Sequence, residues 1–128
     1  MVATMTETQR RTDEFFEHYQ SALLARDEKA IAKMYAIPSL ILFPGQSLVV
    51  TDPEQTERFF AMAWDQYDGV TAVDRELEIM GEAPGTVWAV VTWTYDGSPR
   101  ERFCYQLVGG PTGNQIAVLT PMTLPDRG

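Results

Sequence analysis

The chain has 128 residues, of which 45% are hydrophobic and 11% aromatic, which suffices for the core of a single domain. Its formal net charge of −8 and its lack of a basic patch argue against a nucleic-acid partner, because a polyanion would be repelled. No apolar run approaches the roughly 20 residues that span a bilayer, and the N-terminal "MVATMTETQRRTDE" lacks the apolar stretch of a signal peptide. We therefore expect a cytoplasmic protein with no nucleic-acid or membrane partner. Its single cysteine, Cys104, excludes a disulfide within the chain.

The first third of the chain predicts two helices at an angle. Residues 1–11 are polar and aperiodic, so we expect them to form a flexible N-terminus. From Thr12 onward, apolar residues recur at helical spacing, and this predicts a first helix. Asp27 is the expected N-cap of a second helix, which carries Tyr35 inward and ends before Pro38.

Two short strands and a third helix are expected next. "SLILFPGQSLVV" predicts two strands joined by a turn at Pro44–Gly45. In the following segment Asp52 is the expected cap, and Pro53 occupies the first helical position, where a missing amide costs nothing. Gly69 is expected to end this helix.

Beyond Gly69 the hydrophobic period changes from about 3.6 to 2, which indicates strands. Four strands are predicted, in the segments "VDRELEIMGE", "TVWAVVTWTYDG", "RERFCYQLVGG" and "QIAVLTPMT". The predicted fold is α+β, with helices first, an antiparallel meander of long strands last, and the helices on one face of a curved sheet. We expect one domain over residues 12–123 and a C-terminal tail over 124–128.

These elements resemble the nuclear transport factor 2-like superfamily, and its SnoaL-like branch in particular. The resemblance rests on "FFEHYQSALLARD", on "MYA" at the end of the second helix, on "PG", on the Phe-Phe of the third helix and on the long strands. It implies an α+β cone, in which a bent, mostly antiparallel sheet wraps a long helix around an apolar cavity. Many members are homodimers through the outer sheet face. Some are isomerases, dehydratases, cyclases or epoxide hydrolases, and others bind or assemble without catalysis.

The resemblance also suggests which residues line the cavity and which of them react. The expected wall is Phe15, Tyr19, Tyr35, Phe43, Phe60, Trp64, Trp93 and Cys104. In the ketosteroid isomerase branch, a tyrosine eight residues before the aspartate of this segment stabilises an oxyanion, and Tyr19 stands in that relation to Asp27. The positions of that branch's base and acid fall here on Phe43 and near Phe103 and Cys104. The chain is therefore not expected to be that isomerase.

Other chemistries find less support. The only histidine, His18, lies beside the apolar stripe and is expected at the rim, whereas cyclases and dehydratases of the superfamily use a histidine at the cavity floor. One histidine and one cysteine predict no metal site. No nucleotide or phosphate motif is present, so no cofactor is expected.

Two arginines remain as candidate catalytic residues beside Tyr19. Arg75 shares its strand face with apolar residues, so its guanidinium requires either an acidic partner or an acidic ligand. Arg102 shares a face with Cys104, and the same alternatives apply. Tyr19 either points into the cavity or packs in the core with a satisfied hydroxyl.

Two hypotheses follow. In the first, the chain binds a small apolar or aromatic molecule in its cavity, with acid–base or oxyanion chemistry if it is an enzyme. In the second, it is a non-catalytic dimeric module with a vestigial cavity. Trp88 and Trp93 fall on opposite strand faces, which implies that both faces are covered and favours a homodimer.

Overall fold

The computed structural model describes residues 6–110 and 113–124. The helices are α1 (Glu7–Ala25), α2 (Glu28–Ala32), α3 (Pro53–Ala63) and the short 3-10 helix η1 (Trp64–Tyr67). The strands are β1 (Tyr35–Phe43), β2 (Gln46–Val50), β3 (Val73–Ala83), β4 (Thr86–Tyr95), β5 (Ser98–Gly110) and β6 (Gly113–Pro121). Within the described residues no helix is long and apolar enough to cross a membrane.

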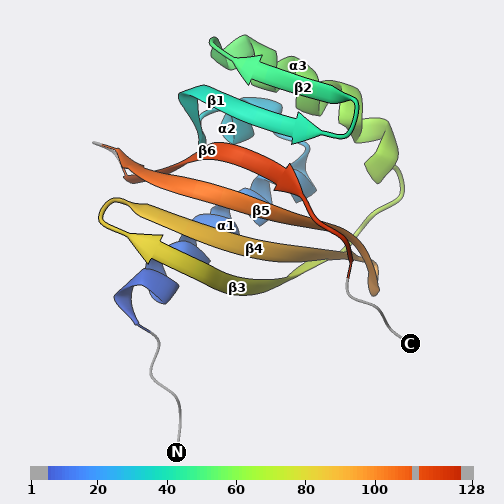
Figure 1. Cartoon of the computed structure of the whole chain (residues 1–128). Coiled ribbons are helices and arrows are strands. Elements are labelled where there is room, and N and C mark those ends of the chain that lie inside the picture. The colour runs from blue at the N-terminus through green and yellow to red at the C-terminus, as the bar shows by residue number, and fades with distance from the viewer. Residues whose placement is uncertain (1–5, 111–112, 125–128) are drawn as a thin grey trace, which may run out of the picture.

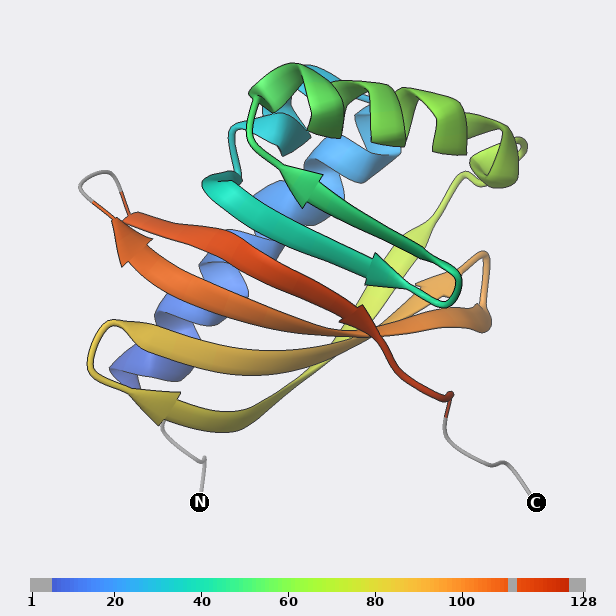
Figure 2. The same cartoon turned by 45° about the horizontal axis from the view of Figure 1, so that its top comes forward.

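The six strands form one curved sheet in the order β2-β1-β6-β5-β4-β3. Neighbouring strands are antiparallel except β1 and β6, which run parallel. All helices lie on one face: α1 crosses β3 to β5 and α3 lies beside β1 and β2, as Figures 1 and 2 show. The predicted α+β architecture, with a closing antiparallel meander, is confirmed.

Helix α1 begins earlier than the sequence pattern predicted. The Thr6 hydroxyl accepts from the Gln9 amide at 3.1 Å, and the Gln9 side chain accepts from the Thr6 amide at 2.9 Å. This capping box satisfies two backbone donors that would otherwise be unpaired, so the helix starts at Glu7. Residues 7–11, which the sequence pattern placed in the flexible N-terminus, are thus helical, and residues 1–5 lie outside the described part.

The second helix is shorter than predicted. Asp27 caps it as expected, accepting from the Ala30 amide at 3.1 Å. It ends at Ala32 and not before Pro38, which lies inside β1. The reason is non-local: Tyr35 pairs with Ile116 of β6, so strand pairing overrides the local helical pattern. Helix α3 has the predicted cap and first-turn proline.

The core lies between α1 and the concave face of the sheet. Phe16, fully buried on α1, stands edge-on to Tyr105 of β5 with ring centroids 4.9 Å apart. On β3, Val73, Arg75, Leu77 and Ile79 share the more buried face, as predicted. Trp93 is buried on the concave face, and Trp88 lies on the opposite, outer face of the same strand.

Candidate active site

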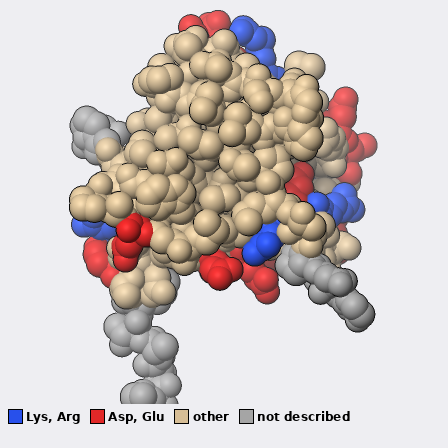
Figure 3. All heavy atoms as spheres, in the orientation of Figure 1, with Lys and Arg blue, Asp and Glu red and all other residues tan. Residues whose placement is uncertain are grey.

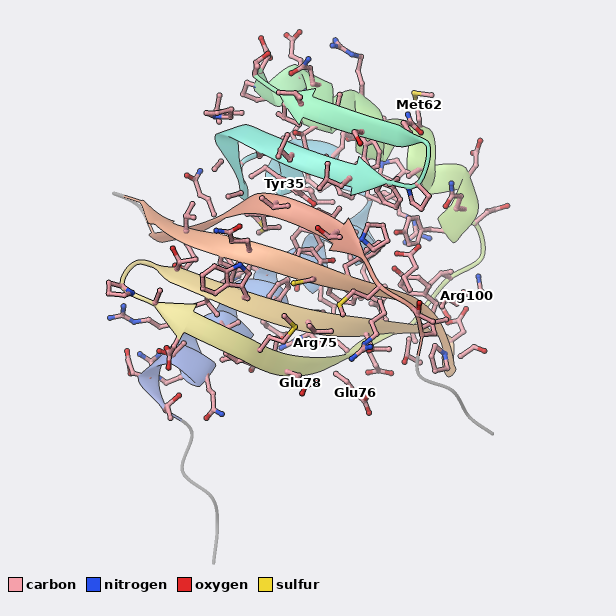
Figure 4. All side chains as sticks on the ribbon, viewed as in Figure 1. Tyr35, Met62, Arg75, Glu76, Glu78 and Arg100 are labelled. Atoms are coloured by element: carbon pink, nitrogen blue, oxygen red, sulfur yellow. The ribbon has the colours of Figure 1, made fainter. Side chains whose placement is uncertain are left out.

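An aromatic pocket of about 460 Å³ opens between α1, α3 and the concave face of the sheet. Its rim includes Met62 on α3, whose side chain is 82% exposed and which Figure 4 shows at one end of the molecule. The wall residues are Tyr19, Leu23, Phe43, Pro44, Gln46, Phe59, Phe60, Met62, Ala63, Gln66, Tyr67, Trp93, Tyr95, Glu101, Phe103, Tyr105 and Leu119. Rings dominate this wall, as they do in many small-molecule sites.

Glu101 is the one carboxyl on that wall, and no lysine, arginine or histidine accompanies it there. It lies on β5 opposite Trp93, half-buried among aromatic rings. The Tyr95 hydroxyl lies 3.2 Å from Glu101 Oε2, and the Tyr67 hydroxyl lies 3.5 Å from both carboxyl oxygens. These hydrogen bonds are long. Among the described residues, Glu101 has no basic side chain within ion-pair distance.

The surroundings change the acidity of these three groups. Burial raises the pKa of the Glu101 carboxyl above its usual range, although the Tyr95 and Tyr67 hydroxyls oppose this in part by hydrogen bonding. Burial, and then the neighbouring Glu101 charge, raises the pKa of Tyr67 to about 12. The pKa of Tyr95 is also raised, chiefly by burial. The carboxyl therefore holds its proton to higher pH than an exposed glutamate does.

Two further polar pairs lie at the buried end of the pocket. The hydroxyls of Tyr19 and Tyr35 are 2.9 Å apart, and the indole N–H of Trp93 donates to the Tyr105 hydroxyl oxygen at 2.8 Å. All four side chains are at most 2% exposed. The pocket therefore has a deep end with phenol groups and a second, half-buried region around Glu101.

Solved structures resemble this architecture over almost the whole chain. A domain of unknown function with a cystatin-like fold from Nostoc punctiforme is 15% identical, with 98% of this chain and 82% of that chain covered and a TM-score of 0.62. The chain has the cystatin-like fold. The fold that the sequence resemblance implied, a bent sheet around a long helix, is thus confirmed.

Two other solved structures with this cystatin-like architecture bear different functional names. One, from Novosphingobium aromaticivorans, is named as a candidate aromatic ring hydroxylase; it is 12% identical over 97% of this chain and 94% of that chain, with a TM-score of 0.66. Another, from Xanthomonas campestris, is named as a candidate calcium/calmodulin-dependent protein kinase II association domain. It is 14% identical over 98% and 96% of the two chains, with a TM-score of 0.67. No protein-family model and no curated protein matches the chain.

The cystatin-like cone brings about half of the predicted wall residues to the pocket. Tyr19, Phe43, Phe60 and Trp93 are among the residues that line it. Three other predicted residues do not line the pocket but contact residues that do. Phe15 stacks on Tyr19, and the Tyr35 hydroxyl forms a hydrogen bond with the Tyr19 hydroxyl. Trp64 packs on Phe60, and its indole N–H donates to Glu28.

Cys104 was expected in the cavity wall and Arg102 was a candidate catalytic residue, but neither lines the aromatic pocket. Cys104 pairs with Val90 and Arg102 with Thr92, whereas the pocket residues of β5 are Glu101, Phe103 and Tyr105. Because side chains alternate along a strand, Cys104 and Arg102 point to the outer face. There Arg102 lies 3.9 Å from Glu78 and donates to the Thr123 carbonyl at 3.3 Å.

Arg75 faces α1 and is not part of the aromatic pocket. Its guanidinium contacts Asp13 at 2.9 Å, Glu17 at 3.0 Å and the Gln20 side-chain oxygen at 2.6 Å. An acidic partner within the protein, one of the two alternatives raised by its strand position, is therefore present. Figure 4 shows Arg75 on the edge strand β3, whereas Met62 on α3 lies toward the other edge of the sheet.

Sequence reasoning missed Glu101, although a signal was present. Glu101 alternates in phase with Phe103, Tyr105 and Leu107, so an acid occupies an otherwise apolar strand face, as Arg75 does on β3. His18 is exposed, in agreement with its predicted place away from the cavity floor. Across residues 6–110 and 113–124, no cluster of three or more His, Cys, Asp or Glu side chains could hold a metal ion.

Proposed function

We propose that the chain binds a small apolar or aromatic molecule in the aromatic pocket and that Glu101 transfers a proton to or from it. The observation that supports this most is the single half-buried carboxyl on a wall of rings. A ligand that fills the pocket would exclude water from the carboxyl and strengthen its interaction with the reacting group.

The environment of Glu101 suits a general acid or base. Proton transfer is most efficient when the pKa of the catalytic group lies near the working pH, and burial moves the Glu101 pKa toward neutrality. Tyr95 and Tyr67 orient the carboxyl by hydrogen bonds, and its place on the pocket wall makes it accessible to a ligand. The reaction class is proton transfer at a carbon or oxygen of an apolar substrate.

Binding and proton transfer can be tested separately. A thermal-shift screen with apolar ketones, epoxides and phenols should raise the unfolding temperature of the protein for at least one class. For a bound ketone, exchange of its acidic C–H with D₂O, followed by NMR, should be accelerated by the wild-type protein. Glu101→Gln keeps the shape of the side chain and should slow this exchange about 100-fold or more. Glu82→Gln makes the same change at an exposed glutamate of β3 outside the pocket and is the matched control.

The results separate the two parts of the proposal. No stabilisation by any of the three classes would contradict ligand binding. Equal exchange rates for the wild type and Glu101→Gln, with a bound ketone, would contradict the role of the carboxyl.

A second candidate function is assembly of two copies through the outer sheet face. An outer row crosses five strands: Val49 pairs with Leu40, Leu40 with Val118, Val118 with Gln106, and Gln106 with Trp88. Val49 is 55% exposed. Figure 3 views this face, whose centre is free of charged residues while acids and bases lie around its edge.

A second copy suits this surface because its margin contains both acidic and basic side chains. Arg102 and Glu78 lie near one side of the face, so a two-fold axis could place the base of one copy against the acid of the other. Sedimentation equilibrium at micromolar concentration should give a dimer for the wild type and a monomer for Val49→Asp. Met62→Asp places the same charge on exposed α3 and should stay dimeric. A wild-type monomer would contradict this second function.

A further inference from the structure

Within the described part of the chain, the proton of the Tyr105 hydroxyl has no acceptor. An indole N–H can only donate, so in the 2.8 Å contact between Trp93 and Tyr105 the phenol oxygen is the acceptor. The phenol's own proton must therefore point elsewhere. Among residues 6–110 and 113–124, no hydrogen bond takes that proton.

Bulk water cannot easily take this proton either. Tyr105 and Trp93 are each 1% exposed. A buried donor without a partner is costly, and native proteins rarely keep one unless water or a ligand satisfies it. Both side chains line the aromatic pocket, so the occupant of that pocket is the available acceptor.

Tyr19 provides a second donor at the same end. One proton of the Tyr19–Tyr35 pair forms the 2.9 Å hydrogen bond, and the other proton has no acceptor among the described residues. Tyr19 belongs to the pocket wall and Tyr35 does not. If Tyr35 donates to Tyr19, the Tyr19 proton is free to enter the pocket. The ring centroids of Tyr19 and Tyr105 are 5.9 Å apart, so the two phenols are neighbours at the deep end of the pocket.

The charge of the surroundings selects a neutral ligand. Burial raises the pKa of both Tyr19 and Tyr105, so these phenols stay protonated and remain donors. The deep end contains no cation, because no lysine, arginine or histidine belongs to the wall. A buried anion without a cationic partner is strongly unfavourable, which disfavours carboxylate and phosphate ligands.

We propose that the ligand is a neutral ring compound with an acceptor oxygen, such as a ketone or quinone, and that Tyr105 donates its hydrogen bond to that oxygen. This inference rests on the proposed function, since it names the chemical class of the molecule that fills the pocket. Tyr105 acts as a specificity-determining residue. Glu101 lies four residues before Tyr105 on β5, and both side chains line the aromatic pocket, so one ligand can contact both.

The test compares 9-fluorenone with fluorene, which have the same ring system with and without a carbonyl oxygen. Titrations followed by tryptophan fluorescence should show fluorenone binding to the wild type about tenfold more tightly. The infrared carbonyl stretch of bound fluorenone should lie at lower frequency than in an apolar solvent, because a hydrogen bond weakens the C=O bond. This second readout needs no variant.

Tyr105→Phe then assigns the donor. The variant should bind fluorene within about twofold of the wild type, lose the preference for fluorenone and lose most of the infrared shift. If both compounds bind the wild type equally and the carbonyl stretch is unshifted, the inference is overturned and the proposed function stands. If the shift persists in Tyr105→Phe, the assignment to Tyr105 is overturned. If neither compound nor any other apolar ligand binds, the proposed function itself fails.

Discussion

Arg75→Met should destabilise the protein by about 1–2 kcal/mol without changing ligand binding. The Arg75 side chain is 11% exposed, whereas its partners Asp13 and Glu17 are 47% and 64% exposed. Removing one partner of a fully buried ion pair costs about 3–5 kcal/mol, and an exposed pair contributes about 0–1 kcal/mol. Methionine keeps the apolar stem, and water can hydrate the two carboxylates that remain, so the loss should fall between these limits.

Urea unfolding followed by circular dichroism measures this loss. With a slope of about 1–3 kcal/mol per molar urea, the midpoint should fall by roughly 0.5–1 M. Arg58→Met is the matched control, because Arg58 lies 3.8 Å from Glu54 and both side chains are largely exposed. Its midpoint should change by less than about a quarter of that amount.

Two results would refute this reasoning. If Arg75→Met is no more destabilising than Arg58→Met, the contacts of Arg75 with α1 do not anchor that helix to β3. If Arg75→Met loses ligand binding while its urea midpoint is unchanged, Arg75 takes part in binding, and its assignment to the helix contact is wrong.

Two further predictions concern the core and the β4–β5 turn. Phe16→Ala removes a fully buried ring and should cost about 3–5 kcal/mol, seen as a lower thermal midpoint; an unchanged midpoint would contradict the described core. Asp96 accepts from the Ala72 and Thr71 amides at 2.8 and 3.1 Å, and these hydrogen bonds lower its pKa below the ordinary 3.8. Its stabilising contribution is therefore present at neutral pH and lost as the pH falls through the lowered value. Asparagine tolerates the same left-handed backbone, so Asp96→Asn should remove only the carboxylate. The urea midpoint of the variant should therefore fall less steeply with decreasing pH than that of the wild type, and parallel curves of midpoint against pH would contradict the assignment.

The strands and helix caps could be predicted because their signals are local. Alternation from Val73 onward and the Asp52–Pro53 start of α3 depend only on neighbouring residues, and the structure confirms both. The end of α2 could not be read in this way. Tyr35 continues a helical stripe in the sequence, but its partner Ile116 lies far along the chain, and that parallel pairing decides its conformation.

The site was only partly predictable, because alternation separates the two faces of a strand without saying which one is concave. Cys104 and Phe103 are neighbours in sequence, and only the pairing of Glu101 with Trp93 shows that Phe103 faces the pocket. The strand register is interrupted between Trp93 and Thr94 and between Gln106 and Leu107. Counting residues along the sequence therefore does not show which residues of neighbouring strands share a face.

Strand β6, the last in the chain, lies in the middle of the sheet between β1 and β5. A nascent polypeptide that has not yet released Gly113–Pro121 from the ribosome therefore consists of two sheet fragments that cannot join, the β1–β2 hairpin and the β3–β5 meander. Until β6 arrives, both fragments leave strand edges and apolar side chains open to association with other chains. Shielding by a chaperone during synthesis should matter most in that interval.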